Sequence, residues 1–330
     1  MTRDYLFDNC KVFLIFLVVA GHFVGPGASD NTFLLLLKWV IVSFHMPAFI
    51  FISGYFSKKE MPLLVTVKKL ALPYLIYEVI YYLWYVLVLH KSTQLALLKP
   101  KFTLWYLMAL FFWRVITPYV KKLPFHFVLA LFAGILIGFS GMEDNFLTIP
   151  RALVFYPFYL AGTYLDRERI TRLRTQKMKI LAAVIVSAIS LILCLMGWKR
   201  ITTMLIFYGR YSYETMHQTM ITGVLWRIFM YVIGFLMTYA LLILMTEKKL
   251  SISYIGTRTM AIYLFHGLTF KFLESCTGVL KNIDTVLETV LLLGGCVFLT
   301  WFFSLKPFTW FTNLCSANVP AFHRNDHANS

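Results

Sequence analysis

The sequence contains few charged residues. Only 14% of its 330 residues are Asp, Glu, Lys or Arg, whereas 59% are hydrophobic and the mean hydropathy is +0.72. A water-soluble domain of this length cannot bury that much apolar surface in its own core. Lipid is the second apolar environment that such a chain requires, so the composition predicts an integral membrane protein.

Acidic residues and paired cysteines are also scarce. The chain has 15 Asp and Glu against 31 Lys and Arg, and the basic residues form short clusters between apolar segments. This arrangement is typical of membrane topology, so we expect no nucleic-acid partner. The five cysteines lie far apart with no Cys-x-x-Cys pair, which predicts neither a disulfide framework nor a bound metal.

Charges, prolines and glycines divide the chain into about ten apolar segments long enough to span a bilayer. We therefore expect an all-α membrane protein, a polytopic bundle of about ten transmembrane helices. The expected spans are 9–25, 34–56, 70–89, 103–118, 125–141, 150–165, 179–197, 222–245, 259–276 and 286–304. The stretch 198–221 is too polar to span, and its pattern indicates an interfacial or re-entrant segment.

The basic loops predict the orientation. If the N-terminus is cytoplasmic, more than half of the 31 Lys and Arg residues fall on the cytoplasmic side, and ten spans also return the C-terminus there. No extramembrane segment is long enough to fold alone. We expect one membrane domain over residues 1–317, followed by a short polar tail over 318–330, in a multi-pass protein of the cell membrane.

The first apolar segment carries three titratable residues, Asp8, Lys11 and His22. In a helix, the eleven residues from Lys11 to His22 turn through about 1,100°, roughly 20° past three full turns, and Asp8 lies within about 60° of both. The three therefore share one stripe. The same eleven residues rise about 16 Å, so Lys11 and His22 cannot touch.

The second segment holds the string Ser43-Phe44-His45-Met46-Pro47, followed by Ser53 and Tyr55. Pro47 frees a carbonyl near His45, and such a break is tolerated in a membrane helix where it lines a cavity. We expect His45 to lie at a depth at or between those of Lys11 and His22.

Further polar residues are open to two interpretations. Glu78 falls mid-span, where it either orients a histidine or forms an ion pair with no chemical role. Arg114 suits an interfacial anchor as well as a ligand contact. Arg169 and Arg172, in the basic loop after the sixth span, either fix the topology or grip a phosphorylated ligand.

Aromatic residues at the fourth span are equally ambiguous. Trp105 and Tyr106 fit an interfacial belt, although stacking on a sugar ring would use the same residues. His266, in the ninth span, is a further intramembrane histidine that could bond a neighbouring helix or serve a site.

These motifs together resemble the acyltransferase family 3 membrane proteins, in particular the fucose 4-O-acetylase-like branch. The matching residues are Arg3-Asp4, Asp8, Lys11, Gly21-His22, Phe44-His45-Met46-Pro47, Ile52-Ser53-Gly54-Tyr55-Phe56, Leu104-Trp105-Tyr106-Leu107 and the segment 255–266 that ends in Leu264-Phe265-His266. The resemblance covers essentially the whole chain, and the first 60 residues are its specific part.

The resemblance implies a multi-pass O-acyltransferase. Such a protein takes an acyl group, usually acetyl from cytoplasmic acetyl-CoA, and places it on a hydroxyl of a cell-surface glycan or lipid-linked sugar. The family usually has arginine at the position of Lys11. A lysine cannot form the bidentate fork of an arginine to phosphate or carboxylate, so the resemblance does not carry the role of that arginine over to Lys11.

The candidate roles divide into three groups. For catalysis we expect His22 as general base or nucleophile, because imidazole titrates in the right range for either, with His45 or Glu78 orienting it. Donor-binding candidates are Lys11, Asp8, Arg114, Arg169 and Arg172. Acceptor-binding candidates are Trp105, Tyr106, Ser53, Tyr55 and His266.

A transporter is the alternative from another functional class. Its buried histidines and Glu78 would relay protons or bind a solute. Many transporters consist of two repeated halves with interrupted helices, and no internal repeat is visible in this sequence. The sequence therefore favours the enzyme.

Overall fold

The computed structural model describes residues 3–29, 31–142, 146–198 and 202–316. Within these ranges every regular element is a helix, and no strand occurs. The all-α class predicted from the composition is therefore confirmed. The predicted tail over 318–330 lies outside the described residues, and the single-domain assignment over 1–317 stays a prediction.

Thirteen α-helices and several shorter helical turns make up the described chain. The α-helices are α1 (Tyr5–Gly27), α2 (Thr32–Tyr55), α3 (Leu63–Thr66), α4 (Leu72–Leu83), α5 (Trp105–Val120), α6 (His126–Leu136), α7 (Ile149–Tyr164), α8 (Arg167–Leu173), α9 (Gln176–Trp198), α10 (Met220–Leu244), α11 (Thr259–Cys276), α12 (Val286–Phe302) and α13 (Lys306–Cys315). The turns are η1 (Val67–Ala71), η2 (Trp84–Val88), η3 (Phe102–Leu104), η4 (Ile137–Phe139), η5 (Phe146–Thr148), η6 (Thr202–Tyr208) and η7 (Ser253–Thr257).

Five helices of the described chain are long and apolar enough to cross a membrane. They are α1, α2, the combined helix Phe102–Val120, α9 and α10. The pair α12 and α13, bent by 60°, adds a sixth if it counts as one span. The structure thus supports a membrane protein with five or six candidate spans, and it does not confirm the ten that we expected.

Three of the other expected spans are helical but short or interrupted. α6 has 11 residues and α7 has 16, fewer than the roughly 20 that a span requires. α4 has 12 residues and continues at both ends into the π-helical turns η1 and η2. The apolar pattern of the sequence predicted the positions of these helices correctly, but it did not predict their lengths, which depend on where the chain turns.

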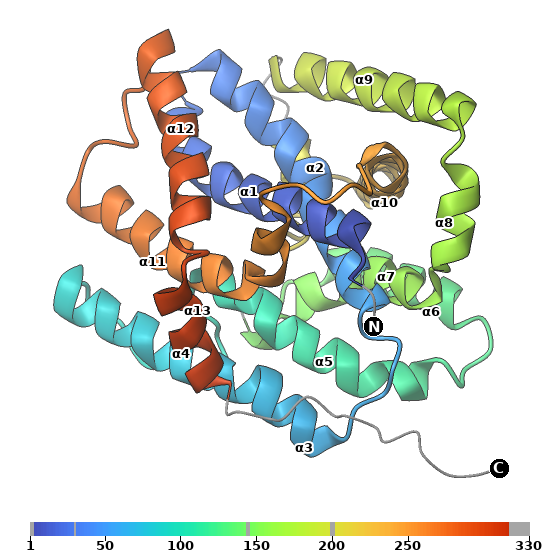
Figure 1. Cartoon of the computed structure of the whole chain (residues 1–330), viewed down its shortest axis with the longest axis horizontal. Coiled ribbons are helices and arrows are strands. Elements are labelled where there is room, and N and C mark those ends of the chain that lie inside the picture. Colours follow the sequence, from blue (N-terminus) through green and yellow to red (C-terminus); the bar gives the residue numbers. More distant parts are fainter. Residues whose placement is uncertain (1–2, 30, 143–145, 199–201, 317–330) are drawn as a thin grey trace.

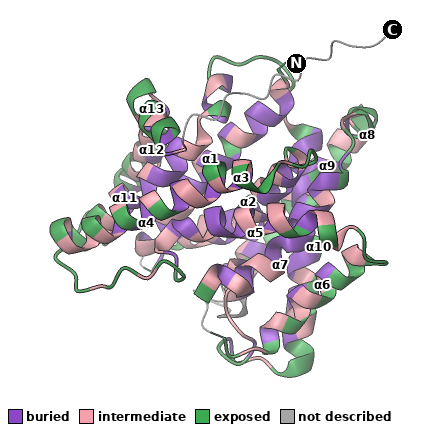
Figure 2. Ribbon diagram, turned by 90° about the horizontal axis from the view of Figure 1, so that it is seen from below, coloured by how far each residue is buried: buried purple, intermediate pink, exposed green. Residues whose placement is uncertain are grey.

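Helix α1 lies at the centre of the bundle, with α2, α10, α11 and α12 packed against it (Figure 1). Its side chains Leu6, Phe7, Leu14 and Ile15 are fully buried. Figure 2 shows buried residues on the central helices and more exposed ones on α6 and α8 at the periphery. The predicted first span is therefore enclosed mainly by protein.

Polar contacts fix the start of α1. Arg167 in α8 pairs with Asp4 (Nε to Oδ2, 2.7 Å) and with Glu247 (Nη2 to Oε1, 2.9 Å). Partial burial opposes the charge of Arg167, but the hydrogen bonds and charges of Asp4 and Glu247 outweigh it and raise the pKa of Arg167. Asn9 donates from Nδ2 to the carbonyl of Thr246 (2.9 Å). The N-terminal turn is thus tied to α8 and to the segment after α10.

Two glycines let α2 and α7 meet backbone to backbone. A Cβ at Gly54 would lie 2.0 Å from the carbonyl oxygen of Tyr159, and one at Gly162 would lie 1.9 Å from that of Phe51. Small residues allow this close approach between membrane helices. The contact places the end of α2, with Ser53, against a rigid neighbour.

The segment 198–221 packs against protein over its described part. Met204, Ile206 and Phe207 in η6 are buried. Tyr213 forms hydrogen bonds to both α6 and η4. Its hydroxyl donates to the carbonyl of Ile135 (2.8 Å), and its backbone N–H donates to the carbonyl of Gly138 (2.7 Å). The sequence predicted an interfacial or re-entrant segment here because polar and apolar residues are mixed. In the structure, the described part of the segment packs on α6 and α10.

Candidate functional site

Two histidines from distant parts of the chain meet beside α1. The rings of His22 in α1 and His266 in α11 lie 5.4 Å apart between centroids. His266 is fully buried, whereas His22 is partly accessible and has no side-chain hydrogen bond to the described residues.

His45 and His266 are held in the same way. Each Nδ1 lies within hydrogen-bond distance of the carbonyl four residues earlier, 2.7 Å to Ile41 for His45 and 2.9 Å to Ile262 for His266. A carbonyl accepts, so each Nδ1 carries the proton of a neutral ring and each Nε2 is left as an acceptor. The Nε2 of His266 is buried without a partner among the described residues. His266 thus offers an acceptor nitrogen next to His22.

Aromatic rings cover His22. Phe102 in η3 lies 4.8 Å and Phe270 in α11 lies 5.8 Å from its ring centroid. The two phenylalanine rings stack on each other at 5.2 Å with an interplanar angle of 7°. Lys271 places its Nζ 4.6 Å from the Phe102 centroid and pairs with Glu274 (2.5 Å).

A cavity of about 200 Å³ lies at the other end of the α1 stripe, beside Lys11. It contains four of the residues that the sequence suggested for the site, namely Lys11, Arg114, Ser53 and Tyr106, together with Tyr263 of α11. Ser53 and Tyr106 hydrogen-bond to each other through their hydroxyls at 2.5 Å. The cavity therefore combines two cations with a hydroxyl-bearing apolar wall.

Asp8 is a charge partner at this cavity. It is buried and accepts from Arg3 (Nε to Oδ2, 2.6 Å) and from Lys11 (Nζ to Oδ1, 3.0 Å). The Lys11 Nζ also lies 4.8 Å from the centroid of Phe56. One carboxylate thus faces two cations, which leaves net positive charge for an anionic ligand.

One face of α11 connects the cavity with the histidines. Tyr263 lines the cavity, and its ring lies 6.0 Å from that of His266, which in turn faces His22. Lys11 and His22 therefore both face α11, which agrees with the shared stripe that their helical spacing predicted. The helix α1 is continuous from Tyr5 to Gly27, so their separation along the axis is about 16 Å.

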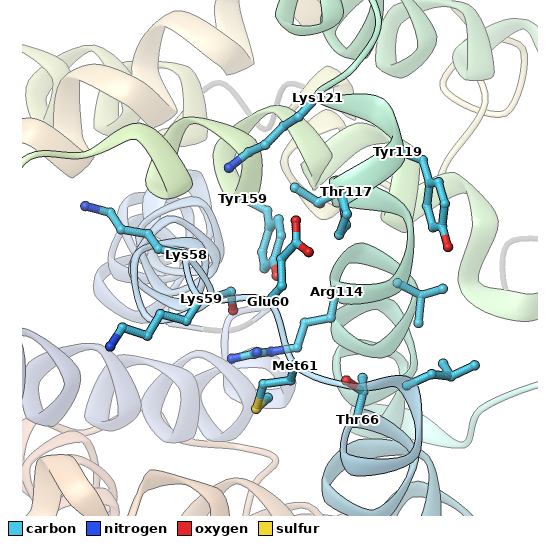
Figure 3. Close-up of a pocket in the computed structure, with 14 residues that line it drawn as sticks. Lys58, Lys59, Glu60, Met61, Thr66, Arg114, Thr117, Tyr119, Lys121 and Tyr159 are labelled. Carbon is cyan, nitrogen blue, oxygen red and sulfur yellow. The ribbon is translucent and has the colours of Figure 1, made fainter. Parts of the chain in front are cut away.

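A second cavity, of about 220 Å³, adjoins the first and shares Ser57 and Arg114 with it. Figure 3 shows Arg114 and Lys121 reaching toward the cavity, the carboxylate of Glu60 between them, and Lys58 and Lys59 pointing to one side. The Nζ of Lys58 donates to the carbonyl of Leu165. The second cavity therefore has a rim that is mainly basic.

Two aromatic candidates lie outside the cavities. Trp105 lies under Arg151 (Cζ 5.0 Å from the ring) and against Phe155 (5.7 Å). Tyr55 stacks on Phe7 at 4.2 Å, at the start of α1. Trp105 therefore packs against residues of α7, whereas Tyr55 packs against α1.

Glu78 does not reach a histidine. This fully buried carboxylate accepts from Lys101 twice, from the side chain (Nζ to Oε1, 3.0 Å) and from the backbone N–H (to Oε2, 3.0 Å). The structure therefore supports the ion pair that the sequence left open.

Arg169 and Arg172 are not brought to the cavities. Both are exposed on α8, where Arg169 lies 3.9 Å from Asp166 and Arg172 lies 3.3 Å from Glu168. Arg169 lines a different groove, which shares no residue with the two cavities. Their surroundings are those of a solvated basic helix.

A family model described as an acyltransferase domain matches residues 4–305. The chain belongs to acyltransferase family 3. Comparison with curated proteins and with solved structures finds no significant match. Membership of acyltransferase family 3 makes this protein a membrane acyltransferase and does not favour the transporter alternative. The fucose 4-O-acetylase-like branch stays a prediction.

Sequence reasoning on this acyltransferase family 3 member missed four residues near the site. They are Lys101, Arg151, Tyr263 and Lys271. Lys271 follows His266 by five residues in an apolar helix, and an intramembrane cation was a signal in its own right. Lys101 and Arg151 lie beside expected span ends, where cations are common, so the sequence gave no reason to select them.

Proposed function

We propose that this acyltransferase moves an acyl group, in the simplest case acetyl, from a coenzyme A thioester to a hydroxyl of a cell-surface glycan or lipid-linked sugar. The observation that carries the proposal is the arrangement along α11. Cations line a cavity at one end of this face, and a histidine cluster with unpartnered acceptor nitrogen lies at the other.

The shape of the donor fits this arrangement. Coenzyme A is anionic at its nucleotide end and slender toward its thioester, so Lys11 and Arg114 would hold phosphate while the arm follows α1 toward His22. Asp8 keeps the Lys11 ammonium in place through their 3.0 Å ion pair. A lysine acts on phosphate as a point charge, so Lys11 would attract the donor without fixing its orientation.

Ser53 and Tyr106 belong with the donor in this proposal. Both line the cavity that contains Lys11, and their mutual hydrogen bond keeps their hydroxyls on its wall. Trp105, which packs against Arg151 and does not line the donor cavity, remains the candidate for contact with the acceptor sugar.

His22 would carry the proton during transfer. Its ring takes the proton of the acceptor hydroxyl as that oxygen attacks the thioester carbonyl carbon. The carbon–sulfur bond then breaks, and the imidazolium returns the proton to the departing thiolate sulfur. Alternatively a His22 nitrogen attacks the thioester carbonyl carbon and the carbon–sulfur bond breaks, which releases the coenzyme A thiolate. The acceptor hydroxyl then attacks the acyl carbon, the carbon–nitrogen bond breaks, and the hydroxyl proton passes to the released thiolate. The bare Nε2 of His266 can accept a hydrogen bond from either the His22 ring or the acceptor.

The donor side would face the cytoplasm. We propose that the ten apolar segments cross or enter the cell membrane with both termini cytoplasmic, because the basic residues around Lys11, Lys58 and Lys121 then meet cytoplasmic acyl-CoA. The same orientation puts His22 toward the opposite surface, where a glycan or lipid-linked sugar would arrive.

Binding of the donor is the first test. Acetyl-CoA at 100 times its dissociation constant should stabilise the detergent-solubilised protein by about 2.7 kcal/mol, seen as a rise in melting temperature. Transfer is then followed from acetyl-CoA labelled in its acetyl group to glycans and lipid-linked sugars of native membranes. No thermal shift and no labelled glycan, from protein that remains folded, would refute the proposal.

A further inference from the structure

The loop between η2 and η3 is fastened to α4 beside the histidine cluster. Glu78 binds both the ammonium group and the backbone N–H of Lys101 at 3.0 Å. The Lys101 ammonium also donates to the carbonyl of Gln94 (2.8 Å). One helical turn before Glu78 in α4, the Tyr74 hydroxyl donates to the carbonyl of Leu97 (2.7 Å) in the same loop. A buried carboxylate therefore holds both the side chain and the backbone of Lys101.

The next residue, Phe102, has an unfavourable backbone conformation. Its φ is +48°, in the left-handed region that non-glycine residues rarely adopt. Such a conformation persists only when its surroundings hold it, and it occurs often at functional sites. The contact that Glu78 makes with the Lys101 N–H lies directly before this residue.

The left-handed turn directs the Phe102 ring onto His22. The ring lies 4.8 Å from His22 and stacks on Phe270 at 5.2 Å. The backbone after it is also held, because the Thr103 hydroxyl lies 3.2 Å from that of Tyr81. A Cβ at Gly267 would lie 3.2 Å from Cδ1 of Phe102, so α11 leaves little room on that side.

We propose that Glu78 is a positioning residue, which acts through Lys101 to hold the Phe102 ring against His22. This rests on the proposed function in so far as His22 is the reacting group. Without the carboxylate, the Lys101 backbone is released, Phe102 relaxes toward an ordinary conformation and its ring leaves His22. The imidazole then loses the wall that fixes its orientation and limits access to it.

The accessibility of His22 gives a test that needs no substrate. Diethyl pyrocarbonate adds to neutral imidazole nitrogen, and mass spectrometry reads the rate for each histidine against exposed His217 as internal reference. We expect Glu78→Gln and Phe102→Leu each to raise the relative rate at His22 at least threefold. The double variant should react no faster than Phe102→Leu alone, because both changes remove the same wall.

Catalysis gives the second readout. With labelled acetyl-CoA and an extract of native glycans and lipid-linked sugars, Glu78→Gln should lower kcat about 10- to 100-fold, since misplacing a reacting group by about 1 Å can cost 100-fold. The KM for acetyl-CoA should stay within about twofold, because the donor cavity is at the other end of α1.

Matched variants separate positioning from general loss of structure. Tyr74→Phe removes another anchor of the same loop on the same helix, and it should leave the His22 rate and kcat unchanged. If Glu78→Gln alone fails to fold because Lys101 is left unpaired, Glu78→Leu with Lys101→Met removes both charges together with the acceptor for the backbone N–H of residue 101, and it should show the same rise at His22.

Three results would overturn the proposal. The first is that His22 in folded Glu78→Gln is modified at the wild-type rate. The second is that the double variant is modified faster than Phe102→Leu by the full increase seen in Glu78→Gln alone. The third is that Tyr74→Phe raises the rate as much as Glu78→Gln does. Failure of the acyltransferase proposal looks different, because acetyl-CoA would then neither bind nor be consumed by the wild-type protein while the His22 rates still respond as expected.

Discussion

Helices α1 and α9 are alike in length and opposite in surroundings. Each has 23 residues and is long and apolar enough to cross a membrane. Of the apolar 18-residue stretch in each helix, 61% is buried in protein in α1 and 22% in α9. After Lys179, α9 has no charged residue or histidine, whereas α1 contains Asp8, Lys11 and His22. An apolar helix keeps titratable groups where protein replaces lipid around it, because neighbours can then pair or solvate them.

The largest expected effect is the removal of the imidazole from α1. His22→Ala should lower acetyl transfer by about 10²- to 10⁴-fold, the usual contribution of a general acid or base. The matched change is Leu191→Ala in α9, whose side chain is exposed, and it should leave transfer unchanged. Comparable turnover in folded His22→Ala and wild-type protein would remove His22 from the mechanism.

Core truncation should separate the two helices by stability. Leu14 in α1 is fully buried, so Leu14→Ala should lower the free energy of unfolding by about 2–5 kcal/mol through the cavity it leaves. Leu191→Ala should change it by less than about 1 kcal/mol, since lipid or detergent fills the space. Unfolding in mixed micelles measures both, and equal losses would contradict the different surroundings of α1 and α9.

The cation of α1 should matter for donor binding. Lys11→Ala should raise the KM for acetyl-CoA about 10-fold, because a hydrogen bond to a charged group contributes about 1.5–3 kcal/mol. Asp8 keeps its partner Arg3 in this variant, which limits the structural damage. Lys177→Ala at the exposed start of α9 is the control and should not change KM. An equal rise for donor and acceptor KM would argue against a donor role.

The smallest expected effect lies on α8, just before α9. Arg172→Ala removes an exposed ion pair with Glu168, and such pairs contribute about 0–1 kcal/mol. We expect less than a twofold change in KM for acetyl-CoA, measured beside Lys11→Ala. A tenfold rise would return Arg172 to the donor site that the sequence suggested.

Part of the site was predictable because it lies within single helices. The spacing of Lys11 and His22 put them on one stripe, and the structure turns both toward α11. The second segment supplied Ser53 as an acceptor-binding candidate, and the structure places it in the cavity with Lys11. Span number was less predictable, because α6 and α7 end at chain turns that hydropathy does not register.

Other residues were ambiguous until long-range packing was known. Glu78 could have met a histidine or a cation, and it meets Lys101, 23 residues later in a loop. Arg169 and Arg172 had the right charge for a phosphorylated ligand, but α8 carries them away from both cavities. Charge and spacing alone do not tell which of several cations reaches a site.

The sequence by itself determined the all-α membrane class, the family and the shared stripe of Asp8, Lys11 and His22. These follow from composition, motif and helical period, which are properties of local sequence. Only the tertiary structure decided that α1 is enclosed while α9 is not, that α11 joins the cavity to the histidines, and that Glu78 holds the loop that carries Phe102. Those facts depend on which helices pack together, since burial and partners are set by contacts between residues far apart in the chain.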